Sequence, residues 1–276
     1  MLPNLRRPGP PGGLFTLNRN SPQAEGLVAF WSARASQGGN VIDMMGHSNL
    51  AITSATWDGG YALRCDAGGE MAELTAPDPI RVTIPYTWSM YFRGLGTASG
   101  GQEIFGIAHN NANQNPWASF IFNENSSNIL MSYDSNGGRS QATGATLASV
   151  NGVDTVLTAM VKDGSQLAYI NGVQTASTSN EVISPRFDAT ALAFIGNHTG
   201  ISRQSQIQFY HGMIWDRELS AGEVWNLWNP ATLWDLYLPV ENIWPVVAAA
   251  PPAVAAHRKV DSVPLGFGKV GGVLVN

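Results

Sequence analysis

One stretch decides the fold, and it reads Gln206-Ile-Gln-Phe-Tyr-His-Gly-Met-Ile-Trp-Asp-Arg-Glu-Leu-Ser-Ala-Gly-Glu-Val-Trp-Asn-Leu-Trp-Asn-Pro230. Its first half alternates as a strand does, because side chains two residues apart project from the same face of a sheet. One face carries Ile207, Phe209, Met213 and Trp215, and His211 is its polar interruption. We therefore expect one half-buried strand whose apolar face lies in the core.

The second half of this stretch predicts one short helix. Ser220 and Glu223 have the spacing of a capping box, in which the N-cap side chain reaches the third amide and the glutamate reaches back. Leu219 and Val224 form the matching hydrophobic staple, and Asn229-Pro230 ends the helix because proline has no amide hydrogen. The apolar stripe that should pack on the core consists of Val224, Leu227 and Trp228.

The rest of the chain predicts about a dozen short strands and no second helix. Clusters of Gly, Asn and Ser separate the apolar runs, as tight turns between strands require. We expect a turn region at Asn40 to Gly46 and a turn at Trp57-Asp-Gly-Gly60. The remaining predicted strands are Gly26–Trp31, Leu50–Thr53, Tyr61–Cys65, Thr87–Arg93, Ile104–Ala108, Trp117–Phe122, Ile129–Tyr133, Val156–Val161, Leu167–Ile170, Val173–Ala176 and Ala191–Gly196.

Two of these segments give the clearest local signals. In Thr87–Arg93 the large side chains Trp88, Met90 and Phe92 alternate, so their face should be core. The segment from Val156 to Ala176 contains the dipeptides Asp163-Gly164 and Asn171-Gly172. Such pairs supply the positive φ angles of tight hairpins, which predicts a meander of three antiparallel strands. Together the elements predict an all-β sandwich of two antiparallel sheets in a jelly-roll arrangement.

Composition agrees with that fold class. Charged residues make up 13% of the 276 residues, compared with about 25% in typical soluble domains. The length fits one large β domain with appendages or two small domains. Cys65 is the single cysteine, which excludes an intramolecular disulfide, and we expect it to be a small buried hydrophobic side chain.

The charges are distributed unevenly along the chain. Segments 1–26 and 245–276 contain the basic residues Arg6, Arg7, Arg19, Arg258, Lys259 and Lys269 against the acidic residues Glu25 and Asp261, a balance of 6 - 2 = +4. The middle of the chain therefore carries 9 basic and 18 acidic residues, a balance of -9. An acidic body argues against nucleic acid as a partner, since phosphate binding needs clustered Lys and Arg. The basic segments either dock on neighbouring acidic surfaces or are solvated tails.

The ends of the chain predict two extended arms around a single domain. Residues 1–25 are rich in Pro and Gly and have no apolar run of the kind that a secretory signal needs. Val246–Ala256 is apolar, but it is too short to span a membrane and is interrupted by Pro251-Pro252. We therefore expect arms at 1–25 and 233–276, a domain at 26–232, no membrane partner, and folding in a cytoplasm.

The order of these motifs resembles the laminin-G-like domains of the concanavalin A-like jelly-roll superfamily. The resemblance covers residues 26–232 and rests on Gly26-Leu-Val-Ala-Phe-Trp31, Thr87-Trp-Ser-Met-Tyr-Phe-Arg93, Leu167-Ala-Tyr-Ile-Asn-Gly-Val173 and Gly212-Met-Ile-Trp-Asp-Arg-Glu-Leu-Ser-Ala-Gly-Glu-Val224, with Phe194-Ile-Gly196 between the last two. It implies two stacked antiparallel sheets, one of them concave, with loops at the rim. It leaves function open, because this fold hosts lectins, glycosidases, adhesion modules and structural domains.

The flanks of the domain resemble something narrower. The lead-in Leu17-Asn-Arg-Asn-Ser-Pro-Gln-Ala-Glu-Gly26 and the ending Trp225-Asn-Leu-Trp-Asn-Pro230 are similar to laminin-G-like proteins encoded among tailed-bacteriophage structural genes. This resemblance implies a virion protein that is synthesised in the cytoplasm of a bacterial host.

The sequence contains no motif of a known catalytic site. Jelly-roll glycosidases need carboxylates on one face of a strand that flank the glycosidic bond, and the nearest spacing, Glu70-Met-Ala-Glu73, places the two on opposite faces. No Gly-x-Ser-x-Gly elbow and no phosphate-binding glycine loop is present. The five histidines lie in unrelated contexts, namely His47, His109, His198, His211 and His257. We therefore expect a protein that is not an enzyme.

Cofactors are not expected either. The family resemblance implies that calcium is often held at the sheet rim, and Asp134, Asn136 and Asp188 are candidate ligands, but no motif fixes a set. Zinc would need Cys and His at short spacing, which the chain lacks.

Two hypotheses from different classes remain. In the first, the chain is a non-enzymatic virion structural protein, a capsid decoration, cement or accessory protein whose arms bind a major capsid or tail protein and copies of itself. Residues 264–276 end in an apolar segment that could add a strand to the sheet edge of a neighbour. The candidate assembly contacts are Arg6, Arg7, Arg19, Arg258, Lys259, Phe267 and Lys269.

In the second hypothesis, the chain is a carbohydrate-binding module of a tail fibre or adhesin. Sugar sites use aromatic rings and side-chain amides, which the run His109-Asn-Asn-Ala-Asn-Gln-Asn-Pro116 and its neighbours offer. Large sandwich cores also use tryptophan, so each ring has a packing interpretation as well. The candidate glycan contacts are Trp57, Asn110, Asn113 and Trp117.

Overall fold

The computed structural model describes residues 15–47, 49–66, 69–74, 85–96, 102–109, 118–122, 128–135, 138–146, 150–162, 165–179, 191–196 and 206–239. The chain divides into two compact units, Met1–Val240 and Glu241–Asn276, and all described residues belong to the first. Within them there is no helix that combines the length and the apolarity needed to cross a membrane.

The described part of the first unit consists mainly of strands. The helices whose bounds are described are η1 (Pro22–Ala24) and α2 (Ala221–Trp228). The first nine strands are β1 (Phe15–Leu17), β2 (Leu27–Gln37), β3 (Asn40–Asp43), β4 (Leu50–Thr53), β5 (Thr56–Asp58), β6 (Ala62–Cys65), β7 (Met71–Glu73), β8 (Tyr86–Gly94) and β9 (Gln102–His109). The others are β10 (Ala118–Phe122), β11 (Asn128–Ser135), β12 (Gly138–Thr146), β13 (Asp154–Lys162), β14 (Ser165–Ile170), β15 (Val173–Ser179), β16 (Ala191–Gly196), β17 (Ile207–Trp215) and β18 (Tyr237–Pro239).

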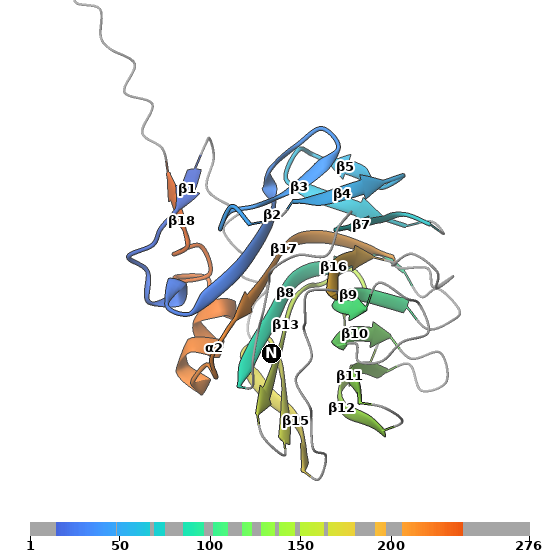
Figure 1. The fold of residues 1–276 in the computed structure, drawn as a ribbon, viewed down its shortest axis with the longest axis vertical. Helices are drawn as coiled ribbons and strands as arrows, with labels where there is room; N and C mark the ends of the chain where they lie inside the picture. Colours follow the sequence, from blue (N-terminus) through green and yellow to red (C-terminus); the bar gives the residue numbers. More distant parts are fainter. Residues whose placement is uncertain are drawn as a thin grey trace, which may run out of the picture. The chain divides into compact units, whose positions relative to one another are not determined.

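The strands form an antiparallel sandwich of two layers, as the sequence predicted. Hydrogen-bonded neighbours follow the order β12-β11-β10-β9-β16-β7-β4-β3-β2-β17-β8-β13-β14-β15, and the β5–β6 hairpin joins β17 next to β2. The path folds over at β2 and β3, which places β17, β8 and β13 in one layer and β16, β9 and β10 in the other (Figure 1). The fold class is therefore confirmed.

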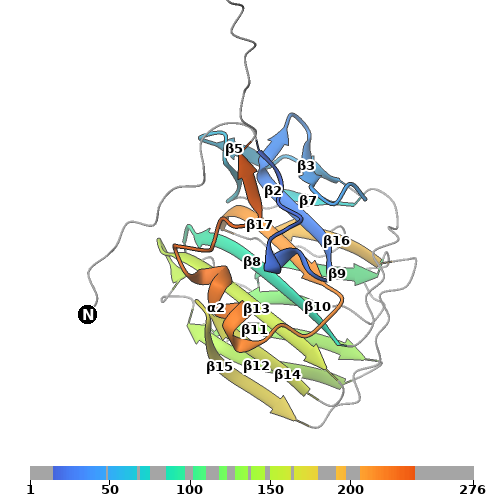
Figure 2. The ribbon, with the colours of Figure 1, turned by 90° about the vertical axis from the view of Figure 1, so that its left-hand side faces the viewer.

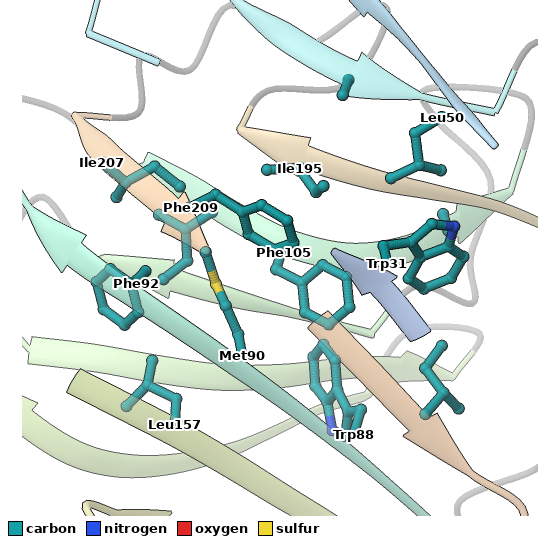
Figure 3. Packing of buried hydrophobic residues seen from close by; sticks show 14 of the residues in the cluster. Trp31, Leu50, Trp88, Met90, Phe92, Phe105, Leu157, Ile195, Ile207 and Phe209 are labelled. Atoms are coloured by element: carbon teal, nitrogen blue, oxygen red, sulfur yellow. The ribbon is translucent and has the colours of Figure 1, made fainter. Parts of the chain in front are cut away.

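The inter-sheet core fills the space between the two layers. It contains Trp31, Leu50, Met90, Phe92, Phe105, Leu157, Ile195, Ile207 and Phe209 among its buried members (Figure 3). The ring of Phe105 is central, with centroids 6.1 Å from Trp31 and 6.2 Å from Trp88. Trp88, Met90 and Phe92 all belong to this core, so the predicted core face of Thr87–Arg93 is confirmed.

Strand β17 does not keep one apolar face, and this part of the prediction was wrong. Its register with β8 shifts between Phe209 and His211, which inserts one extra residue, Tyr210. A β-bulge of this kind reverses which face the following side chains occupy. Phe209 therefore lies in the inter-sheet core, whereas Met213 and Trp215 lie on the opposite face of the sheet.

That opposite face carries a second cluster, the outer-face core, beneath helix α2. Its members from the sheet and from the covering segment are Phe30, Tyr91, Val156, Met160, Tyr169, Met213, Trp215, Leu219, Val224, Leu227, Leu233, Leu236 and Tyr237. Figure 2 looks onto this face and shows α2 over β8 and β13. The helix thus seals one part of the outer face, as the predicted apolar stripe implied.

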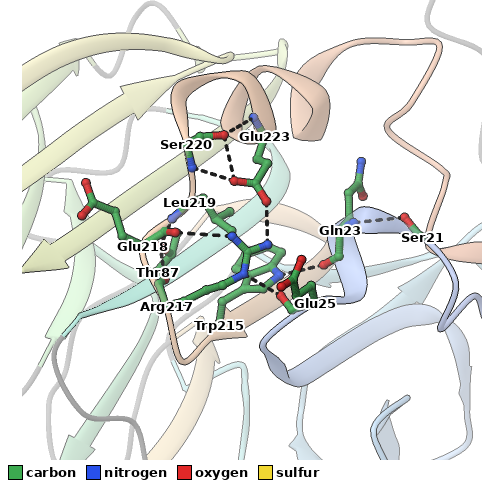
Figure 4. Close-up of polar contacts among 10 residues, drawn as sticks. All are labelled: Ser21, Gln23, Glu25, Thr87, Trp215, Arg217, Glu218, Leu219, Ser220 and Glu223. Atoms are coloured by element: carbon green, nitrogen blue, oxygen red, sulfur yellow. Dashed lines mark hydrogen bonds and ion pairs between the residues drawn. The ribbon is translucent and has the colours of Figure 1, made fainter.

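Hydrogen bonds cap the N-terminus of α2 and connect η1 to strand β17 (Figure 4). The Ser220 amide donates to Glu223 Oε2 at 2.7 Å and the Glu223 amide donates to Ser220 Oγ at 3.3 Å, which confirms the capping box. Arg217 Nη2 also donates to Glu223, and these bonds lower the pKa of the Glu223 carboxyl to about 2. On the other side, the Trp215 indole donates to the carbonyl of Gln23 at 2.8 Å.

The described parts of the two predicted arms pack on the sandwich. Strands β1 and β18 pair antiparallel, with Phe15 opposite Pro239, and Tyr237 is buried against Phe15 at a ring distance of 4.4 Å. Gln23 is buried as well, and its side-chain amide donates to the carbonyl of Thr232 at 2.9 Å. The packed unit therefore extends beyond the expected boundaries at residues 26 and 232, whereas residues 1–14 and 240–276 lie outside the described residues.

Other local predictions can be compared directly. The three-stranded meander is confirmed as β13, β14 and β15, and Asn171 and Gly172 at its second turn have φ angles of 54° and 78°. The expected turn region at Asn40 to Gly46 was wrong for residues 40–43, which form β3, and is confirmed for residues 44–46. The prediction also missed β12, a strand of small and polar residues without an apolar alternation. Asp163-Gly164 lies outside the described residues.

Candidate aromatic and polar binding surface

The outer face of the sheet has a second part, which lies outside the area that the apolar side chains of α2 cover. It lies where strands β5, β6, β17, β8 and β13 run side by side. Because Leu63 and Cys65 of β6 point into the inter-sheet core, Arg64 between them belongs to the outer face, and the same alternation places Gln208 there. We call this part the open surface and define it by Tyr61 in the β5–β6 turn and by the outward residues of these strands, namely Thr56, Asp58, Arg64, Gln208, Tyr210, Arg93 and Asp154.

A stack of tyrosines forms the aromatic part of the open surface. The rings of Tyr61 and Tyr210 are parallel within 9° at a centroid distance of 6.4 Å. Tyr210 is the bulged residue of β17, and its ring also packs on Tyr91 at 4.6 Å. Tyr91 is buried, whereas Tyr61 is 44% exposed. The bulge therefore places the Tyr210 ring against Tyr61, which is the most exposed ring of the stack and the one that a ligand can contact.

The turn before β6 is built around the Tyr61 ring. Gly59 has a φ angle of 61°, a conformation that side chains other than glycine rarely adopt. A Cβ atom at Gly59 would lie 2.6 Å from Cε1 of Tyr61. The Trp57-Asp-Gly-Gly60 segment was predicted as a turn from its glycine pair, and the structure shows that this turn makes room for the ring.

An ion pair flanks the tyrosine stack. Arg93 on β8 and Asp154 on β13 are direct register partners, and Arg93 Nε donates to Asp154 Oδ1 at 2.7 Å. The hydroxyl of Tyr210 donates to the same oxygen at 3.2 Å. The hydrogen bond from Arg93 to Asp154 raises the pKa of the Arg93 guanidinium. Burial together with the Asp154 charge raises the pKa of the Tyr210 hydroxyl, which therefore stays a neutral donor.

The ion pair keeps unused capacity for hydrogen bonds. Among the described residues, the two Nη groups of Arg93 and the Oδ2 atom of Asp154 have no partner. The side chains are 42% and 22% exposed. The pair can therefore offer a ligand both donors and an acceptor without first breaking its own bond.

A second polar group lies on the other side of Tyr210. The side-chain amide of Gln208 donates to Asp58 Oδ2, and Arg64 Nε donates to Asp66 Oδ2 at 2.5 Å. The bond to Asp66 raises the pKa of the Arg64 guanidinium. Both arginines of the open surface are thus hydrogen-bonded to carboxylates.

Of the residues predicted as glycan contacts, Trp57 is described, and it does not belong to the open surface. Trp57 donates its indole hydrogen to the carbonyl of Gly38 at 2.9 Å, and its ring packs against the inter-sheet core, which corresponds to the packing interpretation. The other three predicted contacts, Asn110, Asn113 and Trp117, lie outside the described residues. Sequence reasoning missed Tyr61 and Tyr210, because only the turn and the bulge bring them together.

The predicted assembly contacts are also almost all outside the described residues, namely Arg6, Arg7, Arg258, Lys259, Phe267 and Lys269. Arg19 is described and exposed. Cys65 is buried, as expected, and burial raises the pKa of its thiol well above the usual range.

The candidate calcium ligands remain untested. Asp134 belongs to β11, and Asn136 and Asp188 lie outside the described residues. Within the part of the chain that the structure describes, no group of three or more His, Cys, Asp or Glu side chains could hold a metal ion.

Comparison with known proteins identifies the class of this sandwich. An antiparallel two-sheet jelly roll with one short helix defines the concanavalin A-like fold, and a laminin-G family model described as "Concanavalin A-like lectin/glucanases superfamily" matches residues 66–225. The chain therefore belongs to this superfamily. No curated protein matches the chain.

Solved structures share the fold at low sequence identity. Trypanosoma rangeli sialidase is 16% identical with a TM-score of 0.57, over 74% of this chain and 32% of the sialidase. The botulinum neurotoxin serotype D binding domain is 14% identical with a TM-score of 0.58, over 74% of this chain and 51% of that one. The chain thus spans about a third to a half of these proteins, one an enzyme and one a binding domain, and the likeness shows the fold alone.

Proposed function

We propose that the chain is a non-catalytic carbohydrate-binding module and that the open surface is its binding site. The observation that carries this proposal is the exposed Tyr61 ring, linked through Tyr210 to an Arg93–Asp154 pair whose Nη donors and Oδ2 acceptor have no partner among the described residues. The lectins and glucanases that give the superfamily its description bind or cleave carbohydrates, which supports the same ligand class.

The chemistry of sugars matches these groups. A pyranose ring has a face of C–H groups that packs on an aromatic ring, as amphipathic ligands do on tyrosine. Its hydroxyls both donate and accept hydrogen bonds, and charged partners make the stronger bonds. Tyr61 supplies the ring, Arg93 supplies donors and Asp154 supplies an acceptor.

The same geometry supports binding without hydrolysis. A glycosidase needs one carboxylic acid that gives its proton to the leaving oxygen and a second carboxylate on the other side of the bond. Asp154 is held by a guanidinium and a phenol hydroxyl, and Asp58 is held by Gln208. These carboxylates act as hydrogen-bond acceptors in this proposal.

The test is a panel of immobilised glycans probed with the full chain and two variants. Tyr61→Ala removes the ring of the open surface, and Trp225→Ala removes an equally exposed ring from α2 (46% exposed compared with 44%). We expect binding of the wild type, binding of Trp225→Ala at the wild-type level, and a loss of about tenfold or more for Tyr61→Ala. A panel without any bound glycan, or equal effects of the two variants, would contradict the proposal.

A second candidate function is assembly in a virion, and the β1–β18 pairing favours it. Because Phe15 lies opposite Pro239, segments 1–14 and 240–276 are joined to the described part of the chain at neighbouring positions. They contain five basic and two acidic residues, whereas segment 15–239 contains ten basic and eighteen acidic residues. Flanking segments with neighbouring attachment points and a charge opposite to that of segment 15–239 are suited to bind neighbouring acidic subunits.

Deletion of each flanking segment tests this second function. A chain lacking residues 1–14 or 240–276 keeps β1, β18 and both cores, so it should fold like the wild type. Under the assembly proposal it should bind its particle or its own copies more weakly, measured by co-sedimentation with particles and by sedimentation velocity. Unchanged association of both deletions would rule the proposal out.

A further inference from the structure

The open surface contains a row of polar side chains that crosses the sheet at right angles to the strands. Direct register partners link Thr56 to Arg64, Arg64 to Gln208, Gln208 to Arg93 and Arg93 to Asp154. Side chains directly opposite each other on antiparallel strands project from the same face. The row therefore spans five neighbouring strands, which at about 4.8 Å per strand is roughly 19 Å.

We infer that the ligand is an uncharged oligosaccharide of several units that lies along this polar row, an inference that rests on the proposed carbohydrate-binding function. Length is the first reason. One sugar ring can cover the region of the Tyr61–Tyr210 stack and the Arg93–Asp154 pair, whereas the row continues through Gln208 to Arg64 on β6 and Thr56 on β5. Thr56 is exposed and the other members are partly exposed, so the whole row is accessible.

The hydrogen-bonding groups suit neutral hydroxyls. Asp154 Oδ2 is an acceptor and the Arg93 Nη groups are donors, and they lie side by side because the two residues share the Nε–Oδ1 bond. Two adjacent hydroxyls of one sugar unit can donate to the carboxylate and accept from the guanidinium at the same time. This arrangement favours a sugar with a vicinal diol, that is, two hydroxyls on neighbouring carbon atoms.

The charge of the row together with the aspartates that contact it disfavours acidic sugars. Its arginines, Arg64 and Arg93, are each hydrogen-bonded to an aspartate, and Asp58 also lies 3.9 Å from Arg64 Nη1. Two guanidinium groups thus face three carboxylates, Asp58, Asp66 and Asp154. A ligand carboxylate would have to displace one of these aspartates or lie beside an uncompensated negative charge, and like charges at such distances repel.

The ligand class therefore differs from that of one protein with the same fold. Trypanosoma rangeli sialidase has a structure in complex with sialic acid, a negatively charged sugar. A surface whose arginines are each paired with an aspartate has no guanidinium whose charge is uncompensated, although the Nη groups of Arg93 can still donate to neutral hydroxyls. Binding should also change little with added salt, because charge attraction does not drive it.

Titration calorimetry with two ligand series tests the inference on the full chain. The first series consists of neutral oligosaccharides of one to four units taken from the best binder of the panel, and the second consists of the same chains with one uronic acid. We expect affinity to rise at least tenfold from one to four neutral units and to fall at least tenfold when the acid is present. Arg64→Ala should reduce the gain with length, Asp154→Asn should weaken every neutral ligand, and Trp225→Ala should change neither.

The outcomes separate this inference from the function on which it rests. Equal affinity for one and four units, or a preference for the acidic series, would overturn the inference while the carbohydrate-binding function stands. Absence of binding to every glycan of the panel would overturn both. Circular dichroism of Arg64→Ala and Asp154→Asn shows whether each variant is folded, and the exposure of Arg64 makes Arg64→Ala the safer of the two.

Discussion

The two parts of the outer face are built on the same three strands and differ in what covers them. Under α2, strands β17, β8 and β13 contribute Trp215, Tyr91 and Met160 to the outer-face core. Farther along, the same strands contribute Gln208, Arg93 and Asp154 to the open surface. The covered part excludes water and stabilises the fold, whereas the open part offers its polar groups to solvent or ligand.

This difference shows how one sheet combines a second core with a binding surface. Burial of apolar area drives α2 onto the face where the strands are apolar. Where the strands become polar, burial would remove water from the Arg93–Asp154 pair and from Gln208, and this desolvation has a free-energy cost. The change of residue type along each strand therefore sets where the cover ends, and the Tyr210 bulge lies close to this boundary.

The largest effect should come from the covered part. Trp215 is fully buried, contacts the outer-face core and donates to Gln23. Trp215→Ala should lower the free energy of unfolding by about 3–5 kcal/mol, because it leaves a cavity and an unpaired carbonyl. Urea unfolding measures the change, with Trp225→Ala on the exposed side of α2 as the matched control, for which we expect less than about 0.5 kcal/mol. Similar losses of unfolding free energy for both variants would contradict the claim that the buried Trp215 ring stabilises the fold more than the exposed Trp225 ring.

Acid should also weaken the covered part. His211 is buried between Phe30, Tyr91, Trp234 and Tyr237, its Nδ1 atom is 3.0 Å from the Tyr237 hydroxyl, and its Nε2 atom has no partner among the described residues. Burial lowers the pKa of His211 from 6.5 to about 3. The unfolded chain therefore takes up a proton that the folded chain refuses, and stability falls as the pH drops from about 6.5 towards 3.

The expected loss from this one group is on the order of 4 kcal/mol at the acid end, since each pKa unit corresponds to about 1.4 kcal/mol. His211→Phe keeps an aromatic ring in the cluster and removes the titrating group. The dependence of unfolding free energy on pH between 6.5 and 3 should be shallower in this variant than in the wild type. Parallel curves for the two proteins would show that His211 does not contribute.

The helix cap at the edge of the covered part should have a smaller effect. Ser220→Ala removes the side chain that accepts from the Glu223 amide, which should cost about 1 kcal/mol. The depressed pKa of Glu223 adds a pH signature, because stability from the ionised carboxylate is present above about pH 4.5 and is lost as the pH falls towards 2. Thermal unfolding of Glu223→Gln and wild type should therefore differ at pH 6 and converge near pH 2.

The open surface should contribute least to stability. Tyr61→Ala removes a half-exposed ring and should change the free energy of unfolding by less than about 0.5–1 kcal/mol, while weakening glycan binding. Gly59→Ala affects the same ring differently, because it places a Cβ against Tyr61 in a strained φ. If Gly59→Ala bound glycans as tightly as the wild type, the turn would not be needed to position Tyr61.

The sequence predicts the fold better than the site, and particular residues show why. The alternation of Trp88, Met90 and Phe92, the Asn171-Gly172 turn and the Ser220–Glu223 box are local signals, and each was confirmed. The bulge at Tyr210 has no such signal. Met213, Ile214 and Trp215 are all apolar, so the pattern is compatible with either face pointing inward.

The open surface depends on register between strands that lie far apart in the sequence. Thr56, Arg64, Gln208, Arg93 and Asp154 align only after four strand pairs have formed. Aromatic residues beside amide-rich runs, such as Trp117 next to residues 109–116, are easier to see in a sequence, and they led the prediction to another part of the chain. The described ends of the two predicted arms form strands instead of extended segments for a related reason. Strands β1 and β18 pair across more than two hundred residues, and no local pattern indicates such a pairing.

The most direct measurement is the structure of the full chain with a bound neutral oligosaccharide. The account predicts a sugar ring against Tyr61, hydroxyls within hydrogen-bond distance of Arg93 Nη and Asp154 Oδ2, and further units towards Gln208 and Arg64. A glycan bound elsewhere, at residues 109–117 or on α2 around Trp225, would contradict the claim that the open part of the outer face is the binding site.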